Sequence, residues 1–179
     1  MSSDRLLLRP PTAQDQRAVL DAHRELARED FEFALGYEDG MSWDQYLERL
    51  HDERFGLRLA EDRVPSTFLL ADVAGEIVGR ISVRHRLNDF LAHEGGHIGF
   101  AVRPGYRRRG YATAILEQGL AIAASLRIDR VLLTCEEGNA GFSAVIEACG
   151  GVFDEVVSGR RGSQVRRYWI DLAQPPSPG

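Results

Sequence analysis

Cysteine is scarce in this sequence of 179 residues, which contains only Cys135 and Cys149. Two cysteines are too few for a disulfide framework or for a zinc site built from cysteine ligands. We therefore expect a reducing compartment, and the cytoplasm is the simplest assignment. We also expect no metal, because His93 and His97 lie in a glycine-containing stretch that disfavours the helix needed to align two ligands.

The sequence also lacks a long apolar run, an excess of positive charge and any lysine. No stretch approaches the roughly 20 apolar residues of a membrane-spanning helix, so we expect no membrane partner. Acidic residues outnumber basic ones by 27 to 22, and the net charge of −5 argues against a nucleic-acid partner. The first residues show no pattern of a secretory signal peptide.

The length fits one domain, for which we expect residues 1–172. The proline-rich residues 173–179 are expected to form a disordered tail. Apolar residues at helical spacing predict helices over 12–27, 42–56, 111–126 and 140–148. Strand-like runs cover 6–9, 67–73, 76–84, 97–102, 131–135, 152–157 and 165–172. The strand–helix–strand unit around 111–126 needs a parallel crossover, so we expect an α/β fold with a mixed sheet and helices on both faces.

The most informative segment runs from His97 to Thr113, where a strand leads through a basic turn into a helix. The first turn of a helix carries unpaired N–H groups, so it can bind an anion. Gly110 and Ala112 would let a phosphate approach the backbone closely, and the arginines before them would attract it. The alternative is a solvated basic turn without a ligand.

Two common phosphate motifs do not fit this turn. A nucleotide triphosphatase loop needs lysine followed by serine or threonine, where this chain has Tyr111 and Ala112. The dinucleotide pattern G-x-G-x-x-G is also missing. What remains, Arg107-x-x-Gly110-x-Ala112 at the start of a helix, resembles the pyrophosphate signature of the GNAT superfamily of acyl-CoA-dependent N-acetyltransferases.

The resemblance to GNAT enzymes extends over nearly the whole chain, because the order of the elements also matches. It implies a mostly antiparallel sheet of about six to seven strands, splayed between 97–102 and 131–135, with acetyl-CoA as co-substrate in the gap. The residues that it implies for cofactor binding in this segment are Phe100, Ala101, Val102, Arg107, Arg108, Arg109, Gly110, Tyr111, Ala112 and Thr113.

A second match lies downstream, where Asn139, Glu147 and Gly150 resemble the superfamily segment N-x-x-x-x-x-x-x-E-x-x-G. It implies that Asn139 and Ser143 hydrogen-bond the cofactor arm. The alternative is an N-cap asparagine and an ordinary serine on a helix face. Three shorter stretches, at 97–100, 134–135 and 166–170, resemble an uncharacterised bacterial branch of predicted acetyltransferases.

Catalysis would need a general base, and the candidates are Glu94 and His97 at the start of the strand that borders the gap. A backbone N–H near Val102 would stabilise the oxyanion. The usual general acid of the superfamily is a tyrosine at the position of Ile146, which cannot donate a proton. Tyr111, Ser143, water or no acid at all are the remaining options.

The acceptor is expected to be a primary amine of a small molecule, an amino acid or a peptide, attacking directly in a ternary complex. In this superfamily the acceptor site is built mainly by the first two helices and their loop, here Glu25 to Asp62, which mixes acidic and aromatic residues. Ordinary amphipathic packing is the simpler explanation of those aromatics. A non-catalytic acyl-CoA-binding or sensing module stays open as an alternative, as does a nucleic-acid binder that uses Arg107 to Arg109. A homodimer is also left open.

Overall fold

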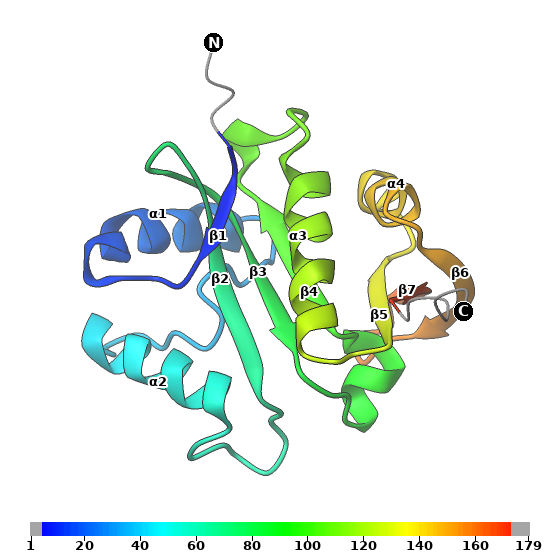
Figure 1. Ribbon diagram of the computed structural model, residues 1–179, viewed down its shortest axis with the longest axis horizontal. Coiled ribbons are helices and arrows are strands. Elements are labelled where there is room, and N and C mark those ends of the chain that lie inside the picture. Colours follow the sequence, from blue (N-terminus) through cyan, green and yellow to red (C-terminus); the bar gives the residue numbers. More distant parts are fainter. Residues whose placement is uncertain (1–4, 173–179) are drawn as a thin grey trace, which may run out of the picture.

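The structure, a computed structural model, describes residues 5–172. The predicted disordered tail lies outside these residues. Figure 1 shows two sheets side by side, with α3 in front of the first and α4 above the second. The elements in chain order are β1 (Leu7–Arg9), η1 (Ala13–Asp15), α1 (Gln16–Ala27), α2 (Trp43–Phe55), β2 (Ser66–Val73), β3 (Glu76–Arg84), η2 (Leu91–Gly95), β4 (Ile98–Val102), η3 (Pro104–Tyr106), α3 (Tyr111–Ser125), β5 (Arg130–Glu136), α4 (Ala140–Ala148), β6 (Val152–Ser158) and β7 (Gln164–Asp171).

The strands form one sheet of order β1-β2-β3-β4 and another of order β5-β7-β6. Every paired neighbour within the two sheets is antiparallel. The helix α3 connects β4 to β5, and Figure 1 shows these two strands running in the same direction. The predicted mixed α/β architecture, with seven strands and a splay between β4 and β5, is therefore confirmed.

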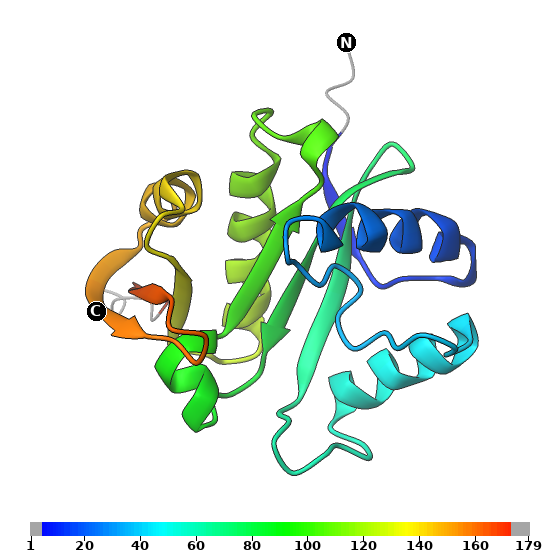
Figure 2. The ribbon, with the colours of Figure 1, turned by 180° about the vertical axis from the view of Figure 1, so that it is seen from behind.

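Two hydrophobic clusters lie on opposite faces of the first sheet. Ile81 and Val83 of β3 belong to the cluster that also contains Ile115 and Leu116 of α3. The other face is covered by α1, α2 and the segment that links them, as seen from behind in Figure 2. Side chains alternate along a strand, so the residues between Ile81 and Val83 face the α1 and α2 side.

Three aromatic residues of α2 and of the segment before it are packing residues. Phe33, Trp43 and Tyr46 are buried in the second cluster, against Phe68 and Leu70 of β2. The Tyr46 hydroxyl donates to the carbonyl of Leu35, which fixes the linking segment from inside. Packing, the simpler of the two sequence-based explanations, therefore accounts for these three aromatics.

Local signals predicted the helix ends well in one case and less well in another. Ser42 accepts a hydrogen bond from the amide of Gln45, and the Gln45 side chain accepts one from the amide of Ser42, as its capping box predicted. The first helix was expected from residue 12, but the chain forms the 3₁₀ turn η1 before α1 begins at Gln16. Thr12 and Asp15 bond each other across that turn, which holds it in the tighter geometry.

The segment expected as a loop over 86–96 contains a π-helical turn, η2. The Asn88 side chain accepts the amide of Leu91, and the Asn88 carbonyl accepts the amide of Ala92. Gly96 then turns the chain with a φ of 69°, and a Cβ there would come within 2.7 Å of the carbonyl oxygen of Leu132. A glycine is thus needed where this turn approaches β5. Within residues 5–172, no helix is both long and apolar enough to cross a lipid bilayer.

Candidate active site at the gap between β4 and β5

The strands β4 and β5 meet at one point and then separate. The amide of His97 donates to the carbonyl of Leu132 at 2.8 Å, and the amide of Leu132 donates to Nδ1 of His97 at 2.9 Å. Beyond this contact, no backbone ladder joins β4 to β5 in the part of the chain that the structure describes. The gap therefore opens toward the carboxyl ends of both strands (Figure 1).

Backbone groups of β4 point into this gap. Hydrogen bonds from Arg84 to His97 and from Arg103 to Val78 show that odd-numbered residues of β4 turn their backbone toward β3. Backbone direction alternates along an antiparallel strand, so Phe100 and Val102 face the gap, whereas Ala101 faces β3. Of the three β4 residues predicted to contact a cofactor, two have backbone groups directed into the gap.

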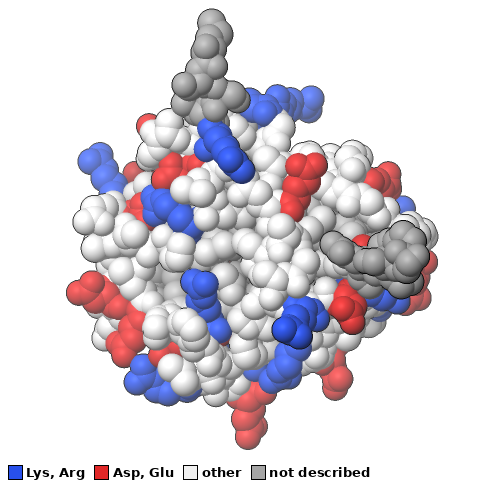
Figure 3. Space-filling view, viewed as in Figure 1, with Lys and Arg blue, Asp and Glu red and all other residues white. Residues whose placement is uncertain are grey.

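The turn after β4 has the geometry of an anion site. Gly110 is the N-cap of α3 with a φ of 82°, in the left-handed region that favours glycine. A Cβ on Gly110 would meet nothing within 4 Å, so the space above it is open. The amides of Tyr111, Ala112 and Thr113 open the helix and have no partner within it. Figure 3 shows basic side chains at the top of the view, where Figure 1 places this turn.

Arg107 connects the turn to the end of α1, on the same side of the gap as β4. Its Nε donates to the carbonyl of Val102 at 3.1 Å, and its Nη1 and Nη2 donate to the two carboxylate oxygens of Glu29 at 3.1 and 2.7 Å. The guanidinium holds the pKa of the Glu29 carboxyl below its usual range. Arg107 thus ties β4 to the end of α1. Arg108 and Arg109 are exposed, and the Arg109 guanidinium lies over the ring of Tyr106.

The first turn of α4 lies on the opposite wall. The side chain of Asn139 accepts the amide of Phe142 at 3.1 Å, so the alternative role as N-cap is confirmed. Phe142 stacks on Phe100 with ring centroids 4.3 Å apart, which joins α4 to β4 across the gap. The Ser143 hydroxyl lies 3.3 Å from Sγ of Cys135 on β5. Both residues predicted for the cofactor arm are therefore at this wall.

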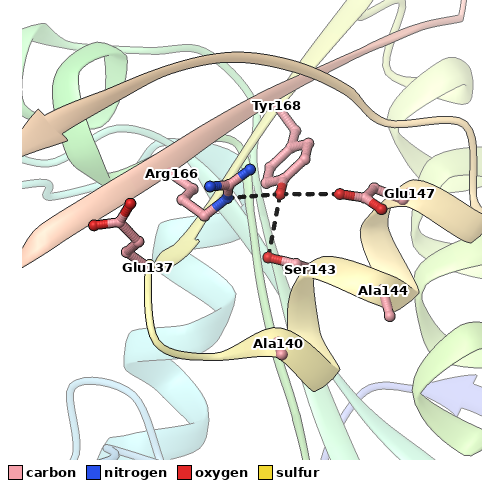
Figure 4. Close-up of a pocket in the computed structure, with 7 residues that line it drawn as sticks. All are labelled: Glu137, Ala140, Ser143, Ala144, Glu147, Arg166 and Tyr168. Atoms are coloured by element: carbon pink, nitrogen blue, oxygen red, sulfur yellow. Dashed lines mark hydrogen bonds between the residues drawn. The ribbon is translucent and has the colours of Figure 1, made fainter.

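The structure adds Tyr168, which the sequence did not reveal. Figure 4 shows its hydroxyl between the side chains of Ser143, Glu147 and Arg166. The oxygen lies 3.2 Å from Oγ of Ser143 and from Oε1 of Glu147, and it accepts from Nε of Arg166 at 3.0 Å. These residues line a cavity of about 260 Å³ beside α4. Ile146, where the superfamily has its tyrosine, is fully buried in the core.

The Glu94 side chain is engaged by a neighbouring turn. Its carboxylate oxygens accept the amide of Arg160, between β6 and β7, at 3.0 and 3.2 Å. Its own carbonyl accepts the hydroxyl of Thr134 on β5 at 2.7 Å. Glu94 thus links η2, β5 and the β6–β7 turn.

The imidazole of His97 is engaged at the vertex of the gap. Burial and the nearby Arg84 lower the pKa of His97 from 6.5 to about 4, so the ring is neutral at neutral pH. Since Nδ1 accepts the Leu132 amide, the ring proton is on Nε2. Within residues 5–172, no group of three or more His, Cys, Asp or Glu side chains is arranged to hold a metal ion.

Comparisons with known proteins agree with this arrangement. A family model for the acetyltransferase (GNAT) domain matches residues 5–152. The structure resembles RimJ of Mycobacterium smegmatis in complex with CoA-disulfide, at 20% identity and a TM-score of 0.69, covering 93% of this chain and 82% of that one. It also resembles a GNAT acetyltransferase of Streptococcus pneumoniae, at 16% identity and a TM-score of 0.68, covering 94% and 100%.

A third similar structure is the spermidine N-acetyltransferase of Vibrio cholerae in complex with CoA and spermine, at 18% identity and a TM-score of 0.64, covering 93% of this chain and 95% of that one. No curated protein sequence matches the chain. The family match covers most of the sequence, from β1 through α4, and includes the glycine-capped start of α3. The chain belongs to the GNAT acetyltransferase family and is an N-acetyltransferase.

Proposed function

We propose that the protein transfers an acetyl group from acetyl-CoA to a primary amine of a small molecule, an amino acid or a peptide, by direct attack in a ternary complex. The observation that carries this proposal is the position of the free amides of α3, at the edge where β4 and β5 have separated. The structures of two similar proteins contain a CoA species, which supports the same co-substrate here. We place the reaction in the cytoplasm.

The residues around the gap fit acetyl-CoA, because the space above Gly110 is open and the amides beside it lack partners. The amides of Tyr111, Ala112 and Thr113 would hold the diphosphate, and Arg108 and Arg109 would attract it. Backbone groups of Phe100 and Val102 would pair with the amide-bearing arm as a neighbouring strand does. When bound, acetyl-CoA supplies an activated acetyl thioester.

We propose that Glu94 and His97 hold the backbone around the site in place and do not act as the general base. The proton of the amine then leaves to solvent. The Glu94 oxygens already accept two contacts from the Arg160 amide, and Nδ1 of His97 already accepts the Leu132 amide. The pKa of His97, about 4, also makes its imidazole a weak base for removing a proton from an amine at neutral pH. The Val102 amide, which faces the gap, is the candidate donor to the thioester oxygen.

Ser143 is the candidate proton donor to the departing thiolate. It lies in the first turn of α4, its hydroxyl contacts Cys135 of β5, and the buried Tyr168 hydroxyl lies behind it. Ser143, three residues before Ile146 on α4, and Tyr168 of β7 supply the hydroxyl groups that Ile146 lacks.

Two measurements on the same preparation test the proposal. Acetyl-CoA is expected to raise the melting temperature, and free thiol is expected to appear when an accepted primary amine is added. Stabilisation without thiol release from any amine of a broad panel would support a non-catalytic acyl-CoA-binding module instead. Absence of stabilisation would contradict the assignment of the gap.

A further inference from the structure

A row of polar side chains lies on the α1 and α2 side of β3. Arg80, Ser82 and Arg84 alternate along β3, with Ile81 and Val83 between them pointing to the α3 face. The row therefore faces α1 and the segment that follows it, the side seen in Figure 2. Ser82 lies directly opposite Gly99 of β4. The strand that borders the gap thus carries no side chain at this position.

Arg80 is a buried cation without an acidic partner. It is 3% exposed, and its guanidinium donates only to carbonyl oxygens, those of Glu32 at 2.7 Å, Phe33 at 3.1 Å and Gly99 at 3.1 Å. No carboxylate of the described chain forms a salt bridge with it. Burial and Arg84 lower the pKa of Arg80 to about 9, so it stays charged at neutral pH. The guanidinium also lies over the ring of Phe31, 4.5 Å from its centroid, so carbonyl oxygens and an aromatic ring, rather than a carboxylate, surround the buried charge.

The Arg84 guanidinium makes fewer hydrogen bonds than that of Arg80. Its one side-chain hydrogen bond among residues 5–172 runs from Nη1 to the carbonyl of Gly95, at a long 3.4 Å. It forms no salt bridge with any described carboxylate, and it is partly exposed. A guanidinium has five N–H donors in a fixed fork, so most of those on Arg84 stay available.

Both guanidiniums converge on Gly99. A Cβ built on Gly99 would lie 3.2 and 3.5 Å from Nη1 and Nη2 of Arg84 and 3.7 Å from Nη1 of Arg80. Between the two arginines, the hydroxyl of Ser82 is 0% exposed and has no hydrogen-bond partner. Two guanidiniums and a free hydroxyl therefore meet at one glycine, and no described carboxylate forms a salt bridge with either guanidinium.

We propose that Arg84, Ser82 and Arg80 receive the carboxylate of the acceptor, so that the substrate is a free amino acid. This inference rests on the proposed acetyl transfer and narrows its acceptor. Arginine matches a carboxylate through two parallel hydrogen bonds, and two guanidiniums repel a polyamine. Neighbouring strands lie about 4.8 Å apart, so a carboxylate over Gly99 places an amine only a few bonds away at the gap.

The test compares glycine and each common L-amino acid with a primary amine against its own carboxamide, which keeps the amine and removes the negative charge. With acetyl-CoA saturating, the best free acid is expected to exceed its amide in kcat/KM by roughly 10-fold to 100-fold, the range expected for a charged hydrogen bond. Equal rates for acid and amide, or a preference for the amide, would overturn the inference. Thiol release with neither class but with other amines would also overturn it, while leaving the acetyl transfer intact.

Three variants test whether the preference for the free acid over its amide depends on Arg84 and Ser82. Arg84→Gln is expected to raise KM for the acid by a similar factor and to leave KM for the amide unchanged. Arg127→Gln, in the exposed turn between α3 and β5, should change neither KM. Ser82→Ala should weaken use of the acid without lowering the melting temperature, because the hydroxyl has no partner to lose. Equal effects on acid and amide would mean that these residues only support the fold.

A direct binding measurement tests the carboxylate site even if no acceptor is acetylated. Calorimetric titration of the CoA-saturated protein with the best acid and its amide is expected to show heat for the acid alone, reduced in Arg84→Gln. If no amine gives thiol release yet the acid binds in this way, the proposed function fails and the carboxylate site stands. If neither acid nor amide binds, the carboxylate site fails.

Discussion

His97 and Leu132 form a reciprocal pair in which each main-chain amide is satisfied by the other residue, the first by a carbonyl and the second by Nδ1 of the imidazole. The pair is located where two sheets touch before they part. The ring nitrogen of His97 takes the place of a backbone acceptor and joins the start of β4 to β5. The same nitrogen is then not free for proton transfer.

Replacing His97 by Ala is therefore expected to destabilise the fold by about 2–4 kcal/mol, because the buried Leu132 amide loses its acceptor and a buried ring is removed. Urea unfolding of the two proteins measures the difference. His51→Ala, on the exposed face of α2, is the matched control and should cost much less. A loss below about 0.5 kcal/mol in His97→Ala would contradict the role of the pair.

The same pair predicts how stability depends on pH. The pKa of His97 is lowered to about 4 in the folded chain against 6.5 when unfolded, so the unfolded state binds a proton first. Its contribution is complete above pH 6.5 and is lost as the pH falls toward 4, by roughly 3 kcal/mol in total. Unfolding free energies measured across this range should fall less steeply in His97→Ala than in the wild type. Parallel curves would show that His97 is not the titrating group.

Substitutions of Glu94 distinguish a catalytic base from a carboxylate that only holds the fold. Glutamine keeps an oxygen that can accept the Arg160 amide, so Glu94→Gln is expected to keep kcat/KM within a few fold. Glu94→Ala should lose more, because the β6–β7 turn is then released. Kinetics of both variants with one acceptor decide the matter: a drop of roughly 100-fold or more in Glu94→Gln would identify Glu94 as the base after all.

The Ser143 hydroxyl is expected to matter for turnover more than for cofactor binding. Ser143→Ala should lower kcat by roughly 10-fold or more while changing the acetyl-CoA dissociation constant little, because one proton donor near the thiolate is removed. Tyr168→Phe should produce a smaller decrease, since it removes only the partner behind Ser143. An unchanged kcat in both variants would leave water as the proton source and would exclude this pair.

Much of the fold could be predicted because its signals are local. The capping box at Ser42, the hairpin around Gly75 and the basic turn before α3 are each encoded within a few residues, and the structure has them there. The splay could be inferred only through a family resemblance, because the missing backbone pairing of β4 with β5 leaves no mark on side-chain types. Asn139 as an N-cap was one of two readings that the sequence left open.

The polar row on β3, the proposed carboxylate site, could not be predicted because its surroundings come from distant segments of the chain. Arg80, Ser82 and Arg84 look in sequence like the solvent-facing positions of an alternating strand. In the structure Arg80 is buried against the carbonyls of Glu32 and Phe33 in the segment after α1, and Ser82 is fully buried. Tyr168 comes near Ser143 only because β7 lies between β5 and β6, a pairing of distant segments. The hydrogen bonds that occupy the side chains of His97 and Glu94 also come from distant segments. His97 bonds β5, and Glu94 bonds the β6–β7 turn.

The phosphate turn is tested by Gly110→Asp, which adds bulk and a negative charge where the diphosphate would bind. The variant is expected to lose thermal stabilisation by acetyl-CoA. Gly40→Asp is the matched control, since Gly40 also has a positive φ, is exposed and has nothing within 4 Å of a built Cβ. Both variants carry the same backbone strain, so a loss confined to Gly110→Asp isolates the ligand site. Equal stabilisation of the two would contradict this assignment.

The measurement that tests the central claim most directly is a crystal structure of the protein with acetyl-CoA. We expect the diphosphate on the amides of Tyr111 to Thr113 and the amide-bearing arm against Phe100 and Val102, between β4 and β5. A cofactor bound elsewhere, or β4 and β5 joined along their length with the gap closed, would contradict the account.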